Sequence, residues 1–309
     1  MINLGIEFNT MRTLIIKLGA IGDVVRTTVL LRELEGEIYW LTKKHSKDFL
    51  NSDRISQIYF MEDENNLNEL KNKEFDLVIN LEEDMGVLKL LKQIKMRRMI
   101  GVFLDEENKI DYSPESKYWF DMSKISKFGL LDADQLKKEN KKSVPQIYIE
   151  MIGKEFHGQE YDIGIKPKPA EEVKGKIGLI NVTTSLWKNK YWNGYDELDY
   201  VLKEKGYDAR FLEMRDTLKK HINDINNCEI VVCGDTFGMH IALALKKKIV
   251  AIFNCTPPDE IYPYDRMIKI KSPMYDKYFL KKEPSMKAMS AVSVEEVYSA
   301  VKEILGKEK

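Results

Sequence analysis

Strand-like apolar runs alternate with helical patterns along most of this 309-residue chain, and this alternation limits the fold more than any other feature. A first series of apolar runs covers 13–18, 37–42, 57–61, 75–81 and 97–103. A second series covers 176–182, 209–214, 229–234 and 248–254. Strands that alternate with helices form parallel sheets with helices on both faces. The sequence therefore predicts two α/β halves with a cleft between them.

A stretch rich in lysine and proline, 164–176, separates the two series and has no apolar periodicity. We interpret it as an interdomain linker and predict domains over 1–165 and 166–309. The last helical pattern, 293–305, opens with a capping box of Ser293 and Glu296. This C-terminal helix could pack back on the N-terminal domain.

Charge and cysteine content exclude several classes of protein. The net charge is −1, from 49 basic and 50 acidic residues, which argues against nucleic acid as a partner. The three cysteines have no zinc spacing and are interpreted as small buried residues, which fits a reducing compartment. Residues 1–11 lack a signal-peptide pattern, and no apolar run approaches the ~20 residues that span a bilayer. We therefore expect a cytoplasmic protein.

The stretch KLGAIGD, at 17–23, joins the first apolar run to the first helical pattern. Gly19 and Gly22 would let the backbone turn tightly and approach a ligand. Asp23 stands near the start of the helix, where a negative charge is stabilised. The residues alone leave three roles open for Asp23: a helix cap, an element of a phosphate-binding loop, or a catalytic base.

A dinucleotide-binding fold is the alternative that this loop first suggests. That fold requires a GxGxxG pattern and an acidic residue at the end of the second strand. Here the pattern is GxxGD, and the second apolar run ends in LTKKH, without an acid. A carboxylate in the loop would also repel a pyrophosphate, so an oxidoreductase that uses a dinucleotide is the weaker reading.

The segment DTFGMH follows the apolar run at 229–234 and forms the main candidate anion site. Asp235 and Thr236 stand at the end of the predicted strand, Gly238 adds flexibility, and His240 lies in the opening of the next helix. Backbone N–H groups at a helix start, with a threonine hydroxyl, can bind a phosphate.

The segment TTSLWKNKYW follows another predicted strand and supplies a second set of polar groups. Thr183 and Thr184 offer hydroxyl donors, while Lys188 and Lys190 offer charge. Two strand ends that converge on one helix start suit a diphosphate. Glu213 lies near the end of the run at 209–214. It could accept hydrogen bonds from a ribose, or could be a surface acid.

Together these motifs resemble glycosyltransferase family 9, the ADP-heptose:lipopolysaccharide heptosyltransferases. LIIKLGAIGDVVRTTVLL resembles the N-terminal strand–turn–helix of the family, and DTFGMHIALAL resembles its D-T-G-x-x-H segment. TTSLWKNKYWN resembles a third motif, TT…K-x-W-P, and DLVINLEEDMGVLKLLKQIKMRRMIGVF resembles an N-domain strand–helix–strand unit.

The resemblance implies a GT-B fold, in which two Rossmann-like domains face a cleft. The N-terminal domain would bind the acceptor and the C-terminal domain the nucleotide sugar. It implies inverting transfer of a heptose from ADP-heptose to a lipopolysaccharide-type or other envelope glycan, without a required metal or other cofactor. Such an acceptor would bring the protein to the cytoplasmic face of the inner membrane.

The resemblance also implies roles for particular residues. Asp23 matches the proposed general base. The donor phosphates and sugar would contact Asp235, Thr236 and His240, together with the Thr183/Thr184 pair and one lysine. Lys190 keeps the motif's distance to its tryptophan, whereas Lys188 keeps its distance to the threonines, and we favour Lys190.

Two departures from the family pattern motivate a rival reading. Phe237 stands where the family usually has the glycine of D-T-G, and the interval from Glu213 to Asp235 is short. A relative that has lost catalysis and acts as a nucleotide-binding or scaffold protein is therefore the main alternative. A basic cluster at Lys92–Arg98 could meet an anionic acceptor or could be a solvated helix face.

Overall fold

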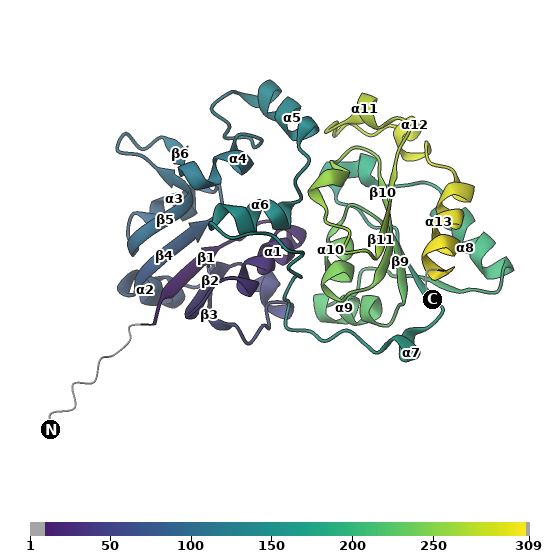
Figure 1. Cartoon of the computed structure of the whole chain (residues 1–309), viewed down its shortest axis with the longest axis horizontal. Coiled ribbons are helices and arrows are strands. Elements are labelled where there is room, and N and C mark those ends of the chain that lie inside the picture. The colour runs from purple at the N-terminus through teal and green to yellow at the C-terminus, as the bar shows by residue number, and fades with distance from the viewer. Residues whose placement is uncertain (1–9, 307–309) are drawn as a thin grey trace.

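The computed structural model describes residues 10–306 and contains two α/β halves, each built on its own sheet (Figure 1). The prediction that the N-terminus lacks a signal peptide falls mainly on residues 1–9, which lie outside the described residues. Within the described part of the chain, no helix is both long and apolar enough to cross a bilayer.

The first sheet has six strands in the order β3-β2-β1-β4-β5-β6. All neighbouring strands are parallel except β5 and β6. Its strands are β1 (Arg12–Ile16), β2 (Glu37–Thr42), β3 (Ile55–Phe60), β4 (Glu74–Asn80), β5 (Lys95–Leu104) and β6 (Ile110–Tyr112). Its helices are α1 (Ile21–Thr27), α2 (Glu64–Asn72), α3 (Met85–Leu91), α4 (Lys117–Phe120), α5 (Leu130–Glu139) and α6 (Val144–Met151).

The second sheet has five parallel strands in the order β11-β10-β9-β7-β8. Its strands are β7 (Lys176–Ile180), β8 (Asp208–Phe211), β9 (Ile230–Gly234), β10 (Lys248–Phe253) and β11 (Met267–Lys271). Its helices are α7 (Ala170–Val173), α8 (Tyr195–Glu204), α9 (Leu218–Asn226), α10 (Phe237–Ala244), α11 (Tyr275–Tyr278), α12 (Met286–Met289) and α13 (Val294–Gly306). The predicted strands of both series are thus confirmed, but β6 and β11 were not predicted. The domain boundary at 165/166 stays a prediction.

The first helix is shorter than its sequence pattern predicts. The pattern indicates a helix from Asp23 to Leu34, but α1 ends at Thr27 and a 3₁₀ turn continues over Thr28–Arg32. The Thr27 and Thr28 hydroxyls donate to the carbonyl oxygens of Asp23 and Val25. Such side-chain bonds to the backbone, with β-branched crowding, loosen a regular α-helix.

The C-terminal helix does not return to the N-terminal domain, so that expectation is wrong. Helix α13 packs against α8, β10 and β11 of its own half (Figure 1). Its apolar stripe, which includes Val297, Val301 and Ile304, completes the core on that face of the second sheet. One of the two bonds of the predicted capping box is present: the Ser293 hydroxyl accepts the Glu296 N–H at 3.2 Å.

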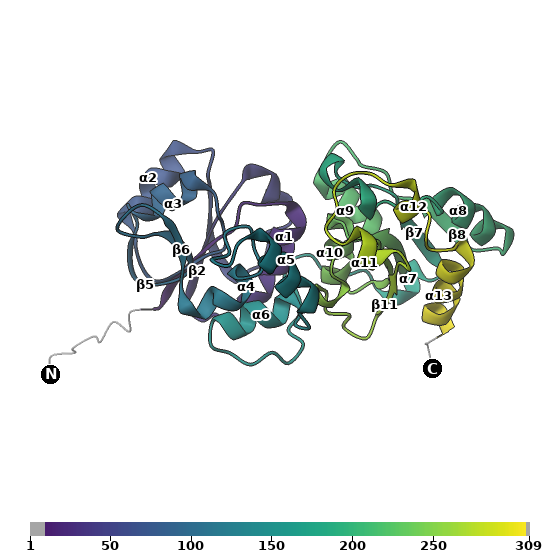
Figure 2. The same ribbon diagram turned by 90° about the horizontal axis from the view of Figure 1, so that it is seen from above.

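The two halves meet where α1 packs against α10, at the centre of the molecule (Figures 1 and 2). A continuous apolar cluster joins buried residues of both halves across this contact. Gly22 permits the close approach, because a Cβ there would lie 2.7 Å from Cδ2 of His240. The start of each helix is therefore held against the other half.

Candidate active site

A cleft of about 1340 Å³ lies between the two halves, beyond the carboxyl ends of the strands. Its walls come from the segments that follow β1 and β4 in the first half and β7 and β9 in the second. Most of the residues predicted for a site line this one cleft: Gly19, Gly22, Asp23, Thr183, Thr184, Lys190, Asp235, Thr236 and His240.

Three predicted residues do not line the cleft. Lys188 and Glu213 are exposed, and the Glu213 carbonyl oxygen accepts a bond from Nδ1 of buried His221. Gly238 is buried inside α10, where a Cβ would lie 2.7 Å from Cδ1 of Ile180. Its place reflects close packing of α10 on β7 instead of flexibility at a ligand.

The β1–α1 loop is held from within, by Glu82 after β4. Oε1 of Glu82 accepts the N–H groups of Leu18 and Gly19 at 2.6 and 2.7 Å and pairs with Lys17 at 3.0 Å. The amides that a phosphate-binding loop would offer are therefore occupied by a protein carboxylate. The chain bends at Gly19 between β1 and α1, and neither Gly19 nor Gly22 has a positive φ, so this bend does not use the left-handed backbone conformation that favours glycine.

Asp23 is not a helix cap. Ala20 occupies the cap position of α1, and the Asp23 carboxylate pairs with Arg26 one turn later, at 2.8 Å. Burial opposes ionisation, but Arg26, Lys17, His240 and Lys190 together hold the pKa of Asp23 below its usual range. The side chain is 36% exposed, so an ionised carboxylate can still face the cleft.

Arg26 and its partners escaped prediction, because they come from distant parts of the chain. Arg26 lies 3.7 Å from Glu260, which also pairs with Lys137 of α5 at 2.9 Å. Figures 1 and 2 both place α5 beside the second half, and these pairs tie it there. Charge and helical spacing could have suggested the Asp23–Arg26 pair, but nothing in the sequence points to Glu260.

The start of α10 carries polar groups without protein partners. Thr236 occupies the cap position but makes no side-chain capping bond. Its Oγ1 and the Nδ1 of His240 are buried and have no hydrogen-bond partner within the described residues. The first N–H groups of a helix also lack internal partners, and together they favour an anion. A buried polar atom left unpaired is costly, which suggests that a ligand satisfies it.

Lys190 and Asp235 form a tight pair beside α10. Nζ of Lys190 lies 2.8 Å from Asp235, whose other oxygen is 3.8 Å from Nε2 of His240. Burial opposes ionisation of Asp235, but Lys190 and His240 lower its pKa well below the usual range. Burial lowers the pKa of His240 to about 4, so this imidazole is neutral at pH 7.

The remaining donor-side residues have local partners. Thr183 donates to the carbonyl oxygen of Trp187 at 3.0 Å, while Thr184 is exposed at the cleft. Phe237 packs on His221, with ring centroids 5.3 Å apart. The phenylalanine that replaces the expected glycine therefore has a packing partner within its own half.

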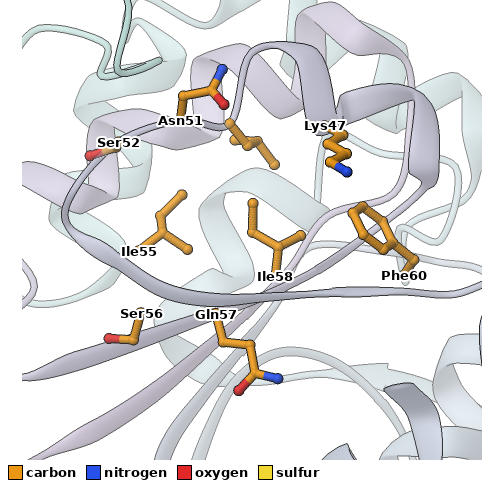
Figure 3. Close-up of a pocket in the computed structure, with 9 residues that line it drawn as sticks. Lys47, Asn51, Ser52, Ile55, Ser56, Gln57, Ile58 and Phe60 are labelled. Atoms are coloured by element: carbon orange, nitrogen blue, oxygen red, sulfur yellow. The ribbon is translucent and has the colours of Figure 1, made fainter. Parts of the chain in front are cut away.

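A second cavity, of about 410 Å³, lies along β3 at the far edge of the first sheet (Figure 3). Its labelled side chains are mostly apolar or amide groups, with Lys47 as the charged member. The arrangement offers no acid–base pair. Across residues 10–306, no group of three or more histidine, cysteine, aspartate or glutamate side chains could hold a metal ion. All three cysteines are buried.

The sequence and the fold were compared with those of known proteins. Residues 214–289 match the model of glycosyltransferase family 9 (heptosyltransferase). The resemblance to that family is confirmed. The matched segment holds the whole start of α10, with Asp235, Thr236 and His240, whereas Asp23 lies outside it. No curated protein matches the sequence significantly.

Solved structures of family 9 proteins superpose on nearly the whole chain. The glycosyl transferase family 9 protein of Veillonella parvula DSM 2008 has a TM-score of 0.70 and 16% identity, over 96% of this chain and 98% of its own. The E. coli ADP-heptose lps heptosyltransferase II has a TM-score of 0.68 and 15% identity, over 96% of this chain and 99% of its own. The E. coli heptosyltransferase WaaC, solved with ADP-2-deoxy-2-fluoro heptose, has a TM-score of 0.64 and 13% identity, over 95% of this chain and 99% of its own. The predicted GT-B fold is thereby confirmed, and the family match supports a glycosyltransferase.

Proposed function

We propose that this chain is an inverting glycosyltransferase that moves a heptose from ADP-heptose to a hydroxyl of an envelope glycan or lipopolysaccharide-type acceptor. The observation that carries the proposal is the start of α10. There, Thr236 Oγ1 and His240 Nδ1 are buried without partners, inside a cleft that also holds Asp23. The structural similarity to the E. coli heptosyltransferases, one of them solved with ADP-2-deoxy-2-fluoro heptose, supports the choice of donor.

The donor diphosphate would lie at the start of α10. The helix dipole and first N–H groups favour negative charge, and Lys190 stands beside them. As the bond to the anomeric carbon breaks, charge grows on the departing diphosphate. Fixed donors aimed at such charge usually supply the largest catalytic contribution. His240 is neutral near pH 7, so it can donate or accept one hydrogen bond without adding a buried charge.

Asp23 would act as the general base. The acceptor hydroxyl attacks the anomeric carbon from the side opposite the diphosphate, its proton passes to Asp23, and ADP leaves with the bonding electron pair. A base must be deprotonated before it acts, and the lowered pKa of Asp23 ensures this at neutral pH. General-base assistance contributes about 10²–10⁴-fold.

A thermal-shift series with ADP, UDP, GDP, CDP and ADP-heptose tests the donor. We expect ADP and ADP-heptose to raise Tm most, since a ligand that binds only the folded state stabilises it. Transfer is then followed as ADP release with envelope glycan acceptors, and NMR of the product reports anomeric configuration. A shift without transfer would favour the scaffold alternative, and no shift with any nucleotide would refute donor binding.

Thr236→Val sharpens this test. Its hydroxyl has no protein partner, so the variant should keep the Tm of the ligand-free protein and lose about 5- to 10-fold in ADP affinity. Thr183→Val is the matched control, because its hydroxyl donates to Trp187 within the protein. Without ligand, Thr183→Val should have a lower Tm than wild type, because it loses this bond. Equal ADP affinity in wild type and Thr236→Val would place the diphosphate elsewhere.

A further inference from the structure

The acceptor-side wall of the cleft, contributed by the first half, is not basic. Four cationic side chains face five carboxylates. The cations are Lys17, Arg26, Lys124 and Lys137, and the carboxylates are Asp23, Glu82, Glu83, Asp84 and Asp134. The formal charge of this wall is therefore −1 at neutral pH.

The buried cations of this wall are already paired within the protein. Lys17 pairs with Glu82 at 3.0 Å, and each side chain is 12% exposed. Arg26 pairs with Asp23 at 2.8 Å, and Lys137 with Glu260 at 2.9 Å. Taking Lys17 for a ligand would leave the largely buried Glu82 carboxylate without its cation, which is unfavourable. Lys124, on the exposed rim, is the remaining cation of the wall.

The carboxylates are less fully used. Asp84 caps α3 by accepting the N–H groups of Gly86 and Val87. Glu83 and Asp134 line the cleft and make no hydrogen bond or ion pair with the residues that the structure describes. The two free carboxylates can accept hydrogen bonds from hydroxyl groups but would repel a carboxylate or phosphate.

The basic cluster that the sequence offered for an anionic acceptor lies away from the cleft. Arg97 pairs with Asp76 at 3.2 Å and Arg98 with Glu115 at 2.9 Å, around the start of β5. Lys92 donates to Asn108, and no member of Lys92–Arg98 lines the cleft. The suggested contact between this cluster and an anionic acceptor is therefore wrong for the cleft.

Apolar side chains complete the wall. Leu130, which is 60% exposed, and the half-buried Trp119 offer apolar surface to the cleft, while Phe120, Met122 and Tyr148 lie buried at its lining. Ligand sites commonly combine such apolar surface with a few polar groups that set orientation. The apolar faces of a sugar ring and its hydroxyl edges match this combination, whereas a charged sugar does not.

We propose that the end of the acceptor that enters the cleft is an uncharged, polyhydroxylated sugar, which Glu83 and Asp134 recognise by its hydroxyls. The same two carboxylates exclude sugars that carry a carboxylate or phosphate next to the reacting hydroxyl. This inference rests on the proposed function, because it assigns the acceptor of that transfer.

Matched pairs of glycans test the proposal. Neutral oligosaccharides, including mannoheptose-terminated and galactose-based ones, are compared with partners in which a CH₂OH is a carboxylate or a hydroxyl is phosphorylated. Binding is measured by calorimetry with ADP present, at low and high salt, and transfer from ADP-heptose is measured in parallel. We expect neutral members to bind about 10-fold or more tightly than their charged partners, with little salt dependence.

Charge-removing variants identify the residues responsible. The double variant Glu83→Gln, Asp134→Asn should reduce the ratio of affinities for neutral and charged glycans, by about 5-fold for each charge removed. Glu106→Gln, an exposed acid outside the cleft, is the control and should change nothing. An unchanged gap in the double variant would remove these residues from the proposal.

The outcomes separate two kinds of failure. Tighter binding of charged glycans, with affinity falling as salt rises, would overturn the acceptor proposal. So would a failure of every neutral glycan to bind while ADP still binds. Absence of ADP binding would instead refute the proposed function itself.

Discussion

Both walls of the cleft pair cations with the protein's own carboxylates, Lys190 with Asp235 in the second half included, but they differ in the neutral polar groups that they leave unpaired. In the first half, Arg26 and Lys17 are spent on the protein's own carboxylates, although Nε of Arg26 keeps no partner among the described residues. In the second half, the start of α10 keeps Thr236 and His240 unpaired in the protein. The unpaired groups of the second wall support the proposed diphosphate site there, whereas the loop amides of the first wall are already bound by Glu82.

This contrast reassigns the glycine-bearing loop after β1. By sequence it resembles a phosphate loop, yet Glu82 occupies its amides. The anion site that we propose is in the other half, at the start of α10, where Thr236 and His240 keep unpaired atoms. Pre-organised donors cost no rearrangement when charge develops, which is the advantage of keeping them free of protein partners.

The sharpest way to break the contrast is Asp23→Asn. We expect kcat to fall by about 10²–10⁴-fold while ADP affinity changes little, because the first wall serves the acceptor proton and the second wall the donor. Asp132→Asn, an exposed first-turn aspartate of α5, is the control. Turnover of Asp23→Asn near that of wild type would refute the base assignment.

Lys190→Met should produce the next largest effect, a loss of about 10²-fold in kcat/KM, since one donor to the leaving group is removed. Asp235 would then be buried without its lysine, so the variant should also be less stable. Lys190→Met with Asp235→Asn should recover Tm without recovering kcat/KM. Lys188→Met, outside the cleft, should stay within about twofold of wild type, and an equal loss there would reverse the choice of lysine.

The pH dependence of stability should reveal His240. Its folded pKa of about 4 is below the ordinary value of 6.5, so the unfolded chain binds more protons between these values. Unfolding free energy should therefore fall as pH drops from about 6.5 towards 4, by at most roughly 1.4 kcal/mol per pH unit from this group.

Urea unfolding at each pH measures that slope. His240→Gln should flatten it, whereas His157→Gln, at an exposed site, should leave it unchanged. The lowered pKa values of Asp23 and Asp235 act in a different window, since their stabilisation is present above pH 4 and lost below it. Burial also lowers the pKa of His221, so His221 adds to the slope in the same window and His240→Gln should reduce the slope without abolishing it. A slope in His240→Gln equal to that of wild type would contradict the assignment.

The smallest expected effect concerns the ion pairs that tie α5 to the second half. Lys137→Met should lower unfolding free energy by about 1–2 kcal/mol, because Lys137 and Glu260 are only 18% and 10% exposed. Lys141→Met should cost less than about 0.5 kcal/mol, because Lys141 and Asp259 are 78% and 43% exposed. Chemical denaturation compares the two, and equal costs would show that burial does not set the strength of these pairs.

Much of the fold and part of the site could be read from local patterns. The spacing of apolar residues and the turn residues between the runs predicted most strands, since side chains repeat with the geometry of each element. Residues that directly follow strands, such as Asp235 and Thr236, were predicted together because the carboxyl ends of parallel strands share one edge. Lys188 and Glu213 show the limit of that rule, since both follow strands along the chain but are exposed and do not line the cleft.

The sequence by itself located most strands and the segments that enter the cleft, because these depend on neighbours within a few residues. It missed β6 and β11 and made α1 too long. Only the tertiary structure decided that Glu82 closes the β1–α1 loop, that Arg26 holds Asp23 beside Glu260, and that Gly22 makes room for His240. These contacts join residues up to hundreds of positions apart. Their energies depend on distance and burial, which no local pattern records.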